Sequence, residues 1–199
     1  MPRDARMIAQ ALDRPDVAKT LLELTTLHEI MPHLTVSNGR RYIDPLNRAM
    51  LEFQITNVLR KAAFLAQIAH ESAELLYFEE IASGWAYDRS QNPRKARDLG
   101  NTRPGDGPRY KGRGPIQLTG RANYRRAGNA LELDLEASPT RASSPNVGFR
   151  IAGWYWFTHH LNARADRQDF RDITRRINGG YNGYAHRLAF YERALRVLR

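Results

Sequence analysis

Two glutamates nine residues apart, Glu71 and Glu80, are the side chains best suited to acid–base chemistry in this sequence. Hydrolysis of a glycosidic bond needs one protonated carboxyl group for the leaving oxygen and one carboxylate that activates water. On one straight helix nine residues span about 900°, so the two side chains would point to opposite sides. They can serve one site only if the chain bends between them, and the irregular pattern of residues 77–84 allows such a bend.

Each glutamate also has a plainer interpretation. A glutamate on a helix, such as Glu71, is usually a solvated surface residue. Glu79 competes with Glu80 for the role of the base, and because neighbours in an extended segment point to opposite sides, only one of them should face the site. His70 precedes Glu71, but a His-Glu-x-x-His zinc motif requires a second histidine where this sequence has Glu74. We therefore expect no metal and no other cofactor.

Two further segments have residue types that suit a sugar ligand. In residues 112–120 (Gly-Arg-Gly-Pro-Ile-Gln-Leu-Thr-Gly) the glycines let the backbone approach a ligand, and an extended strand would present Gln117 and Thr119 on the same side. A hydroxyl there, near the base, can hold the attacking water. Residues 177–184 combine amides, glycines and aromatic rings. The alternatives are a plain turn or a nucleic-acid-binding Gly-Arg-Gly segment for the first, and a helix-capping turn for the second.

Composition narrows the class of protein. The chain has 199 residues, no cysteine and a formal net charge of +10. Its length fits one ordinary domain, or a domain with a small helical lobe. The absence of cysteine excludes disulfide scaffolds, iron–sulfur clusters and cysteine nucleophiles. Residues 89–126 carry 11 basic and 2 acidic side chains. A segment with such a charge excess is typical of a protein with a polyanionic partner, which can be nucleic acid, an anionic membrane surface or an acidic wall polymer.

The elements that position these residues are predicted to be helices. Apolar spacing and Pro or Gly punctuation favour helices over residues 16–31, 44–59, 61–78, 122–131, 145–161, around 170–178 before Gly179-Gly180, and 188–198, with a loop over 83–115. No stretch has the roughly 20 apolar residues that span a bilayer, and the first ten residues lack the apolar run of a signal peptide. We expect a mainly α fold with at most a very small β element.

Three blocks of this sequence together resemble glycoside hydrolase family 19, the chitinase and endolysin family, and most of all its short phage-type endolysins. The blocks are residues 64–72 (Phe-Leu-Ala-Gln-Ile-Ala-His-Glu-Ser), 112–124 (Gly-Arg-Gly-Pro-Ile-Gln-Leu-Thr-Gly-Arg-Ala-Asn-Tyr) and 175–180 (Arg-Arg-Ile-Asn-Gly-Gly). The resemblance implies a lysozyme-like, two-lobed helical domain with a catalytic cleft that cuts β-1,4 bonds by inversion. By motif, Glu71 corresponds to the general acid, Glu80 to the general base and Thr119 to the residue that positions water. The other matched positions imply sugar ligands or support for the cleft: His70, Gln117, Asn123, Asn178 and Arg187.

The departures from the family indicate the substrate. Plant chitinases of the family carry disulfides and a longer segment between the two glutamates, whereas this chain has no cysteine and a gap of nine residues. We therefore expect an endolysin that hydrolyses the peptidoglycan backbone, with a chitinase acting on chitin oligomers or a basic nucleic-acid-binding protein as alternatives. The expected partners are peptidoglycan strands and an anionic wall or outer-membrane surface, without nucleic acid.

The resemblance also sets expectations for organisation. We expect an N-terminal extension over residues 1–20, one catalytic domain over 21–199, and a monomer. Without a signal peptide, the protein would stay in the host cytoplasm until it is released to the wall.

Overall fold

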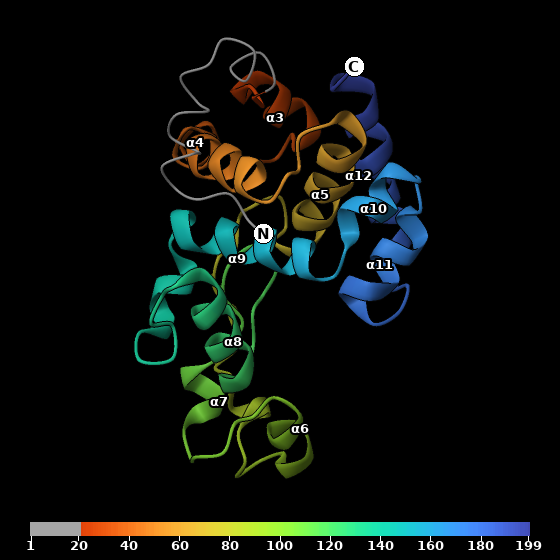
Figure 1. Cartoon of the computed structure of the whole chain (residues 1–199). Helices are drawn as coiled ribbons and strands as arrows, with labels where there is room; N and C mark the ends of the chain where they lie inside the picture. Colours follow the sequence, from red (N-terminus) through yellow and green to blue (C-terminus); the bar gives the residue numbers. More distant parts are fainter. Residues whose placement is uncertain (1–20) are drawn as a thin grey trace. The chain divides into compact units, whose positions relative to one another are not determined.

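The computed structural model describes residues 21–199, and these divide into two compact units. Unit 1 comprises the described residues up to Leu76 together with Gly153–Arg199, and unit 2 is Tyr77–Ala152. Both are built from helices (Figure 1). Across residues 21–199, β structure is limited to two isolated bridges, which pair Arg113 with Glu79 and with Leu118. The mainly α prediction is confirmed. The expected extension over residues 1–20 lies outside the described residues.

Unit 1 is a group of helices that includes α5, the helix that carries Glu71. Its members are α3 (Leu24–Ile30), α4 (Val36–Glu52), α5 (Val58–Glu71), α10 (Leu161–Asp166), α11 (Phe170–Asn178) and α12 (Tyr184–Val197). Helix α12 lies along α5 (Figure 1) and also packs against α3 and α11. The last part of α9 (Pro145–Thr158) belongs to this unit as well. Helix α5 in turn contacts α10, α11 and α12, and Glu71 is its last residue.

Helix α5 is buried on every side in its middle. The side chains from Ala62 to Ala69 are all inaccessible to solvent, which is expected for a helix that is apolar all round. Phe64 packs edge-on against Trp156, with ring centroids 5.3 Å apart. The indole N–H of Trp156 donates to Asn162 Oδ1 over 2.8 Å, so this buried aromatic group is satisfied. A helix fixed in this way is a rigid platform for the residues at its C-terminal end.

The sequence patterns misplaced several helix boundaries, most of all the start of α4 and the end of α5. Helix α4 begins at Val36 after the N-cap Thr35 and contains Pro45 in its interior, so the predicted start at residue 44 is wrong. Proline removes one helical hydrogen bond, but burial of the apolar face of α4 outweighs that local loss. The predicted helix over 61–78 ends at Glu71 instead. After it, residues 73–75 adopt left-handed backbone angles, at a cost of roughly 1–2 kcal/mol each.

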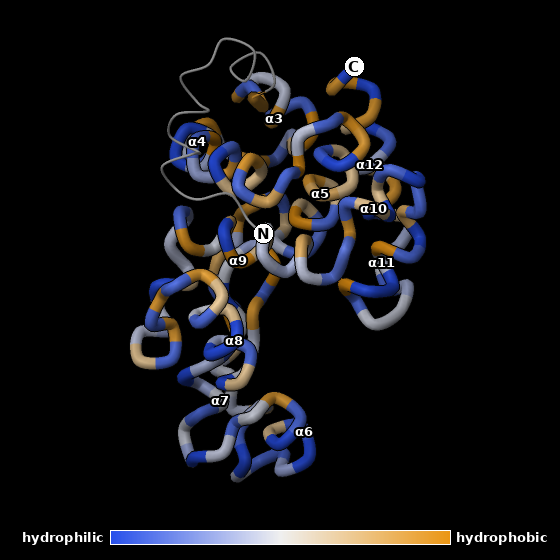
Figure 2. The backbone as a smooth tube through the Cα atoms, in the orientation of Figure 1, coloured by the Kyte–Doolittle hydropathy of each residue, from blue (hydrophilic) through white to orange (hydrophobic). Residues whose placement is uncertain are grey.

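Unit 2 contains short helices joined by ordered loops. They are η1 (Trp85–Tyr87), α6 (Pro93–Asp98), α7 (Asp106–Arg109), α8 (Arg121–Leu131), η2 (Pro139–Ser143) and the first part of α9. The prediction for 122–131 is confirmed by α8, whereas the predicted loop over 83–115 contains three short helices. Figure 2 shows α6 and its flanking segments as mainly hydrophilic, which explains why apolar spacing did not reveal them.

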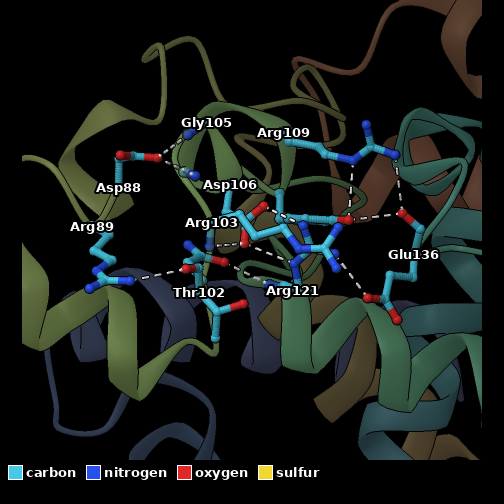
Figure 3. Close-up of polar contacts among 12 residues, drawn as sticks. Asp88, Arg89, Thr102, Arg103, Gly105, Asp106, Arg109, Arg121 and Glu136 are labelled. Atoms are coloured by element: carbon cyan, nitrogen blue, oxygen red, sulfur yellow. Dashed lines mark hydrogen bonds and ion pairs between the residues drawn. The ribbon is translucent and has the colours of Figure 1, made fainter.

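A buried carboxylate organises residues 87–109, which we call the Asp88 lobe. Asp88 is inaccessible to solvent and accepts hydrogen bonds from Ser90 N (3.0 Å) and Ser90 Oγ (2.8 Å). It also accepts from Gly105 N (2.8 Å; Figure 3) and Gly107 N (3.1 Å). The bonds from Ser90, then those from the two glycines, lower the pKa of Asp88 despite its burial. One side chain therefore ties η1 to the segment that leads into α7.

An ion-pair network joins the Asp88 lobe to α8. Arg121, at the start of α8, donates to both carboxylate oxygens of Asp106 and, over 3.0 Å, to Glu136 Oε1 (Figure 3). Its guanidinium also lies over the ring of Tyr110, 4.7 Å from the centroid. Arg125 completes the network with a 2.6 Å contact to Glu136. Because Arg121 and Asp106 are both nearly inaccessible, the pair fixes the geometry of unit 2 from the inside.

No helix in residues 21–199 is both long enough and apolar enough to cross a membrane.

Candidate active site

Glu71 is held in unit 1 by a buried arginine. Arg187 of α12 is 1% exposed, and its Nη2 lies 2.5 Å from Glu71 Oε1. The same guanidinium donates through Nη1 to Gln67 Oε1 over 2.6 Å. Gln67 in turn donates to Thr174 Oγ1 over 2.9 Å. Glu71 therefore ends a chain of side chains contributed by α5, α11 and α12, and its carboxylate has a defined position.

The sequence reasoning missed Gln67 and Thr174. A signal for Gln67 was present, because it is a polar residue in an apolar helix, one turn before Glu71 and hence on the same face. Both side chains are inaccessible to solvent, which is rare for polar groups unless they are hydrogen-bonded. Thr174 gave no signal, since only the three-dimensional structure places α11 against α5.

His70 packs against the start of α12. Its Nδ1 lies 2.9 Å from Nδ1 of His186, and a Cβ on Gly183 would overlap its ring, so only glycine fits there. Burial, and then the positive charge of Arg187, lower the pKa of His70 below 6.5. The ring is therefore neutral near pH 7. A role for His70 as a sugar ligand stays a prediction.

Asn178 lies at the C-terminal end of α11. Gly179 follows it with φ 76° and caps the helix, and Asn178 Oδ1 accepts from Asn182 N over 3.3 Å. The interpretation of this segment as a capping turn is confirmed. Its second interpretation, a sugar-binding segment, stays a prediction, and Tyr181 exposes 46% of its surface beside it.

Glu80 in unit 2 is held by neutral donors. Tyr87 donates its hydroxyl to Glu80 Oε1 over 2.8 Å, and the backbone N–H of Gly112 donates to Oε2 over 3.0 Å. Burial, together with the hydrogen bond to Glu80, raises the pKa of Tyr87 to about 12, so the phenol stays a donor. Both of these donors are uncharged, which suits a carboxylate that must accept a proton from water.

Glu79 has different partners. Its Oε1 lies 3.1 Å from Lys111 Nζ and 3.2 Å from Arg113 Nη2. Partial burial raises the pKa of Glu79, but the hydrogen bonds and charges of Lys111 and Arg113 outweigh this effect and leave the pKa below its usual value. Glu79 is thus engaged in ion pairs. The geometry favours Glu80 as the base.

The segment after Gly112 is a turn. Arg113 and Leu118 exchange both backbone hydrogen bonds, and Gln117 has φ 54°. The expected extended strand, with Gln117 and Thr119 on one side, is therefore wrong, because a left-handed residue breaks the alternation of side chains. The turn still brings Gln117 to Glu80: a Cβ on Gly112 would lie 2.5 Å from Gln117 Oε1 and 3.2 Å from Glu80 Oε2.

Thr119 and Asn123 are half-buried beside this turn. Thr119 Oγ1 donates to the carbonyl of Gln117 over 2.9 Å, and Asn123 Nδ2 donates to the carbonyl of Thr119 over 2.7 Å. Unit 2 therefore groups Glu80, Gln117, Thr119 and Asn123, and unit 1 groups Glu71, His70 and Arg187. In the part of the chain that the structure describes, no cluster of three or more His, Asp or Glu side chains could hold a metal ion.

Comparison with known proteins identifies the family. The family model described as chitinase class I, the model of glycoside hydrolase family 19, matches residues 54–168. A glycosyl hydrolase family 19 domain-containing protein of Haemophilus influenzae is 31% identical over 89% of this chain and 96% of its own length. The chain belongs to glycoside hydrolase family 19. It is therefore a glycoside hydrolase, similar to chitinases.

Other members of family 19 agree with this assignment. An endochitinase of Arabidopsis thaliana is 44% identical over 60% of this chain, which spans only 39% of that protein. The crystal structure of chitinase C from Streptomyces griseus superposes with a TM-score of 0.69 at 24% identity, covering 90% of this chain and 77% of that one. A class IV chitinase of Zea mays gives a TM-score of 0.56 at 23% identity, covering 98% and 90%. The predicted lysozyme-like helical fold is that of these family 19 structures.

Proposed function

We propose that this family 19 glycoside hydrolase cleaves β-1,4 bonds of the peptidoglycan backbone and acts as an endolysin. In this mechanism the carboxyl group of Glu71 protonates the leaving oxygen while Glu80 takes a proton from the attacking water, which inverts the anomeric carbon. Tyr87 and the Gly112 N–H fix Glu80, and Thr119 positions the water. The sugar ligands are His70, Gln117, Asn123 and Asn178, and Arg187 supports Glu71.

The surface of the Asp88 lobe carries the case for peptidoglycan. The lobe exposes six basic side chains (Arg89, Arg94, Lys95, Arg97, Arg103 and Arg109) and one acidic side chain, Asp98, because its other two acids, Asp88 and Asp106, are buried. Chitin is uncharged, whereas the peptides of peptidoglycan carry carboxylates. A cationic surface attracts an anionic polymer and raises the rate of encounter at low salt. The same surface would bind an anionic wall or outer-membrane surface.

Storage in the host cytoplasm as a monomer, and release to the wall at lysis, complete the proposal. The absence of cysteine supports it, since such a chain folds in a reducing compartment.

A chitinase is the second candidate. It is favoured by the names of the plant relatives, which are endochitinases, and by the chitinase neighbours among solved structures. Those relatives match this chain over only part of their own length.

Mass spectrometry of digests decides between the two. Purified peptidoglycan and chitin oligomers are incubated with the wild-type protein and with Glu71→Gln as the inactive control. We expect fragments from peptidoglycan with a new reducing end that identifies the bond, and the α-anomer as the first product by NMR. A triple variant, Arg94→Gln, Lys95→Gln and Arg97→Gln, should slow hydrolysis of peptidoglycan at low salt but not of chitin oligomers. Cleavage of chitin oligomers with peptidoglycan left intact would overturn the proposal.

A further inference from the structure

The chain makes a left-handed turn directly after the helix that carries Glu71. Ala73, Glu74 and Leu75 have φ angles of 49°, 56° and 63°, and none of them is glycine. L-residues adopt this region singly and seldom three in succession. A turn of this kind persists only where its surroundings hold it, and such turns gather at functional sites. The turn separates Glu71 from Tyr77, where unit 2 begins.

Local hydrogen bonds close the end of α5 and span the turn, where Leu76 N donates to the carbonyl of Ala73 over 3.2 Å. Glu74 N donates to the carbonyl of Ala69 over 2.7 Å, which closes the end of α5. Leu75 N donates to Ser72 Oγ over 2.9 Å, and Ser72 Oγ donates to the carbonyl of Ile68 over 2.6 Å. These bonds satisfy the end of the helix. The same hydrogen bonds could form if the left-handed positions were occupied by glycine, the usual residue there at the end of a helix.

The side chain of Glu74 supplies the remaining restraint. It is 9% exposed, although glutamate is seldom buried without a partner. Its Oε2 accepts from the backbone N–H of His33 over 2.8 Å, and its Oε1 lies 2.6 Å from His33 Nδ1. His33 lies between α3 and α4, 41 residues earlier in the chain. The carboxylate therefore ties the turn to a separate part of unit 1 through two hydrogen bonds.

We propose that Glu74 is a positioning residue for Glu71: its buried carboxylate, bound by His33, holds the left-handed turn that ends α5 at the catalytic acid. This inference rests on Glu71 being the acid of the proposed function. We call the two hydrogen bonds between Glu74 and His33 the Glu74 clamp. When this clamp is lost, residues 73–75 relax toward right-handed angles and the last turn of α5 rearranges. The Glu71 carboxyl then spends less time where the leaving oxygen needs it.

Four variants test the proposal through kcat and KM on the glycan that the wild-type enzyme cleaves. Glu74→Ala keeps the strain of an L-residue and removes the clamp, so we expect kcat to fall roughly 10- to 100-fold with KM nearly unchanged, since small misplacements of a catalytic group cost up to about 100-fold. Glu74→Gly removes the two hydrogen bonds to His33 but also the strain at residue 74, and should recover part of kcat. Glu74→Gln still accepts from the His33 N–H and should stay close to wild type. His33→Ala removes one of the two bonds and should have a smaller effect than Glu74→Ala.

Glu132→Ala is the matched control. Glu132 also has a left-handed backbone, with φ 57°, but it is exposed and caps α8 in unit 2. It should leave kcat unchanged. The proposal is overturned if folded Glu74→Ala, or folded His33→Ala where Glu74→Ala does not fold, has the kcat of the wild type, or if Glu74→Gly is no better than Glu74→Ala. Glu71→Gln is measured in parallel: an active Glu71→Gln overturns the assignment of the acid, whereas an inactive one with a fully active Glu74→Ala overturns only the role of Glu74.

Discussion

Glu71 and Glu80 are held in contrasting ways by the two units. Glu71 depends on side chains of three helices, and the links from Gln67 to Thr174 and to Arg187 join residues 107 and 120 positions apart. Glu80 depends on a tyrosine seven positions away and on a backbone N–H. Unit 1 therefore holds the Glu71 carboxylate through contacts between helices that are distant in the sequence. Unit 2 holds the Glu80 carboxylate through donors that the backbone conformation of its loops places there.

The largest expected effect is the loss of either carboxylate. Glu71→Gln and Glu80→Gln should each lower kcat by about 10²–10⁴-fold, the usual contribution of general acid–base catalysis. Glu79→Gln is the control in unit 2: it loses ion pairs with Lys111 and Arg113 but should keep most of the activity. Hydrolysis rates and circular dichroism of the three variants check this. An inactive, folded Glu79→Gln beside an active Glu80→Gln would reverse the assignment of the base.

The second expected effect is a loss of stability when the buried partners of Glu71 are removed. Arg187→Met should destabilise unit 1 by about 3–5 kcal/mol, since it leaves the Glu71 carboxylate and Gln67 without their buried partner. Arg175→Ala on α11 removes an exposed arginine from an ion pair with Asp172 and should change the stability far less, because solvent screens an exposed pair. Urea unfolding measures both. Similar values for the two variants would mean that the buried network contributes no more than a surface pair.

A smaller effect is expected for the donor to Glu80. Tyr87→Phe removes one neutral hydrogen bond and leaves the Gly112 N–H in place. A bond of about 0.5–1.5 kcal/mol corresponds to roughly a 2- to 10-fold lower kcat. Steady-state kinetics at pH 7 measures the change. A loss as large as that of Glu80→Gln would show that Tyr87 itself takes part in the reaction.

The smallest expected effect is a difference between the two units in the pH at which each loses stability. The lowered pKa of His70 means that the unfolded ring binds a proton near pH 6.5 and the folded ring only at a lower pH, so its contribution to stability falls as the pH drops below about 6.5. In unit 2 the hydrogen bond from Arg125, and then that from Arg121, hold the pKa of Glu136 at about 2, so its contribution is lost between about pH 4.5 and pH 2.

Hydrogen exchange of the two units as the pH is lowered checks this order. Protection of α5 and α12 should weaken before that of α8. His70→Asn should reduce the pH dependence of unit 1, and Glu136→Gln that of unit 2. An unchanged pH dependence between pH 5 and 6.5 in His70→Asn would contradict the prediction for unit 1.

The sequence predicted those parts of the fold that depend on local patterns. The helix over 122–131 and the Gly179 cap follow from apolar spacing and from the freedom of glycine, and both are confirmed. Pro45 led to the wrong predicted start of α4, because proline is common at the first position of a helix, whereas here burial of the apolar face of α4 decides. The left-handed turn at 73–75 has no sequence signal, because three L-residues are held there by contacts from elsewhere in unit 1.

Some of the candidate site residues could likewise be predicted from the sequence, whereas others depend on contacts that only the structure reveals. Motif resemblance pointed to Glu71, Glu80 and Arg187, and the structure places Arg187 against Glu71. Pattern analysis left Glu79 and Glu80 as alternatives, since only the surrounding cations distinguish them. Tyr87 went unnoticed because it reaches Glu80 through the path of η1, and a single tyrosine in a Gly-rich segment carries no signal of its own.

The sequence separation of the residues bonded to Gln67 also determines the order in which parts of the protein can fold during synthesis. The bonds of Asp88 close within 19 residues and can form as soon as that segment leaves the ribosome. The chain from Thr174 through Gln67 to Arg187 can close only after α11 and α12 have emerged. A nascent chain that already displays the folded Asp88 lobe would therefore still lack the partners of Glu71, and, if Glu71 is the acid as proposed, hydrolytic activity would arise only late in translation.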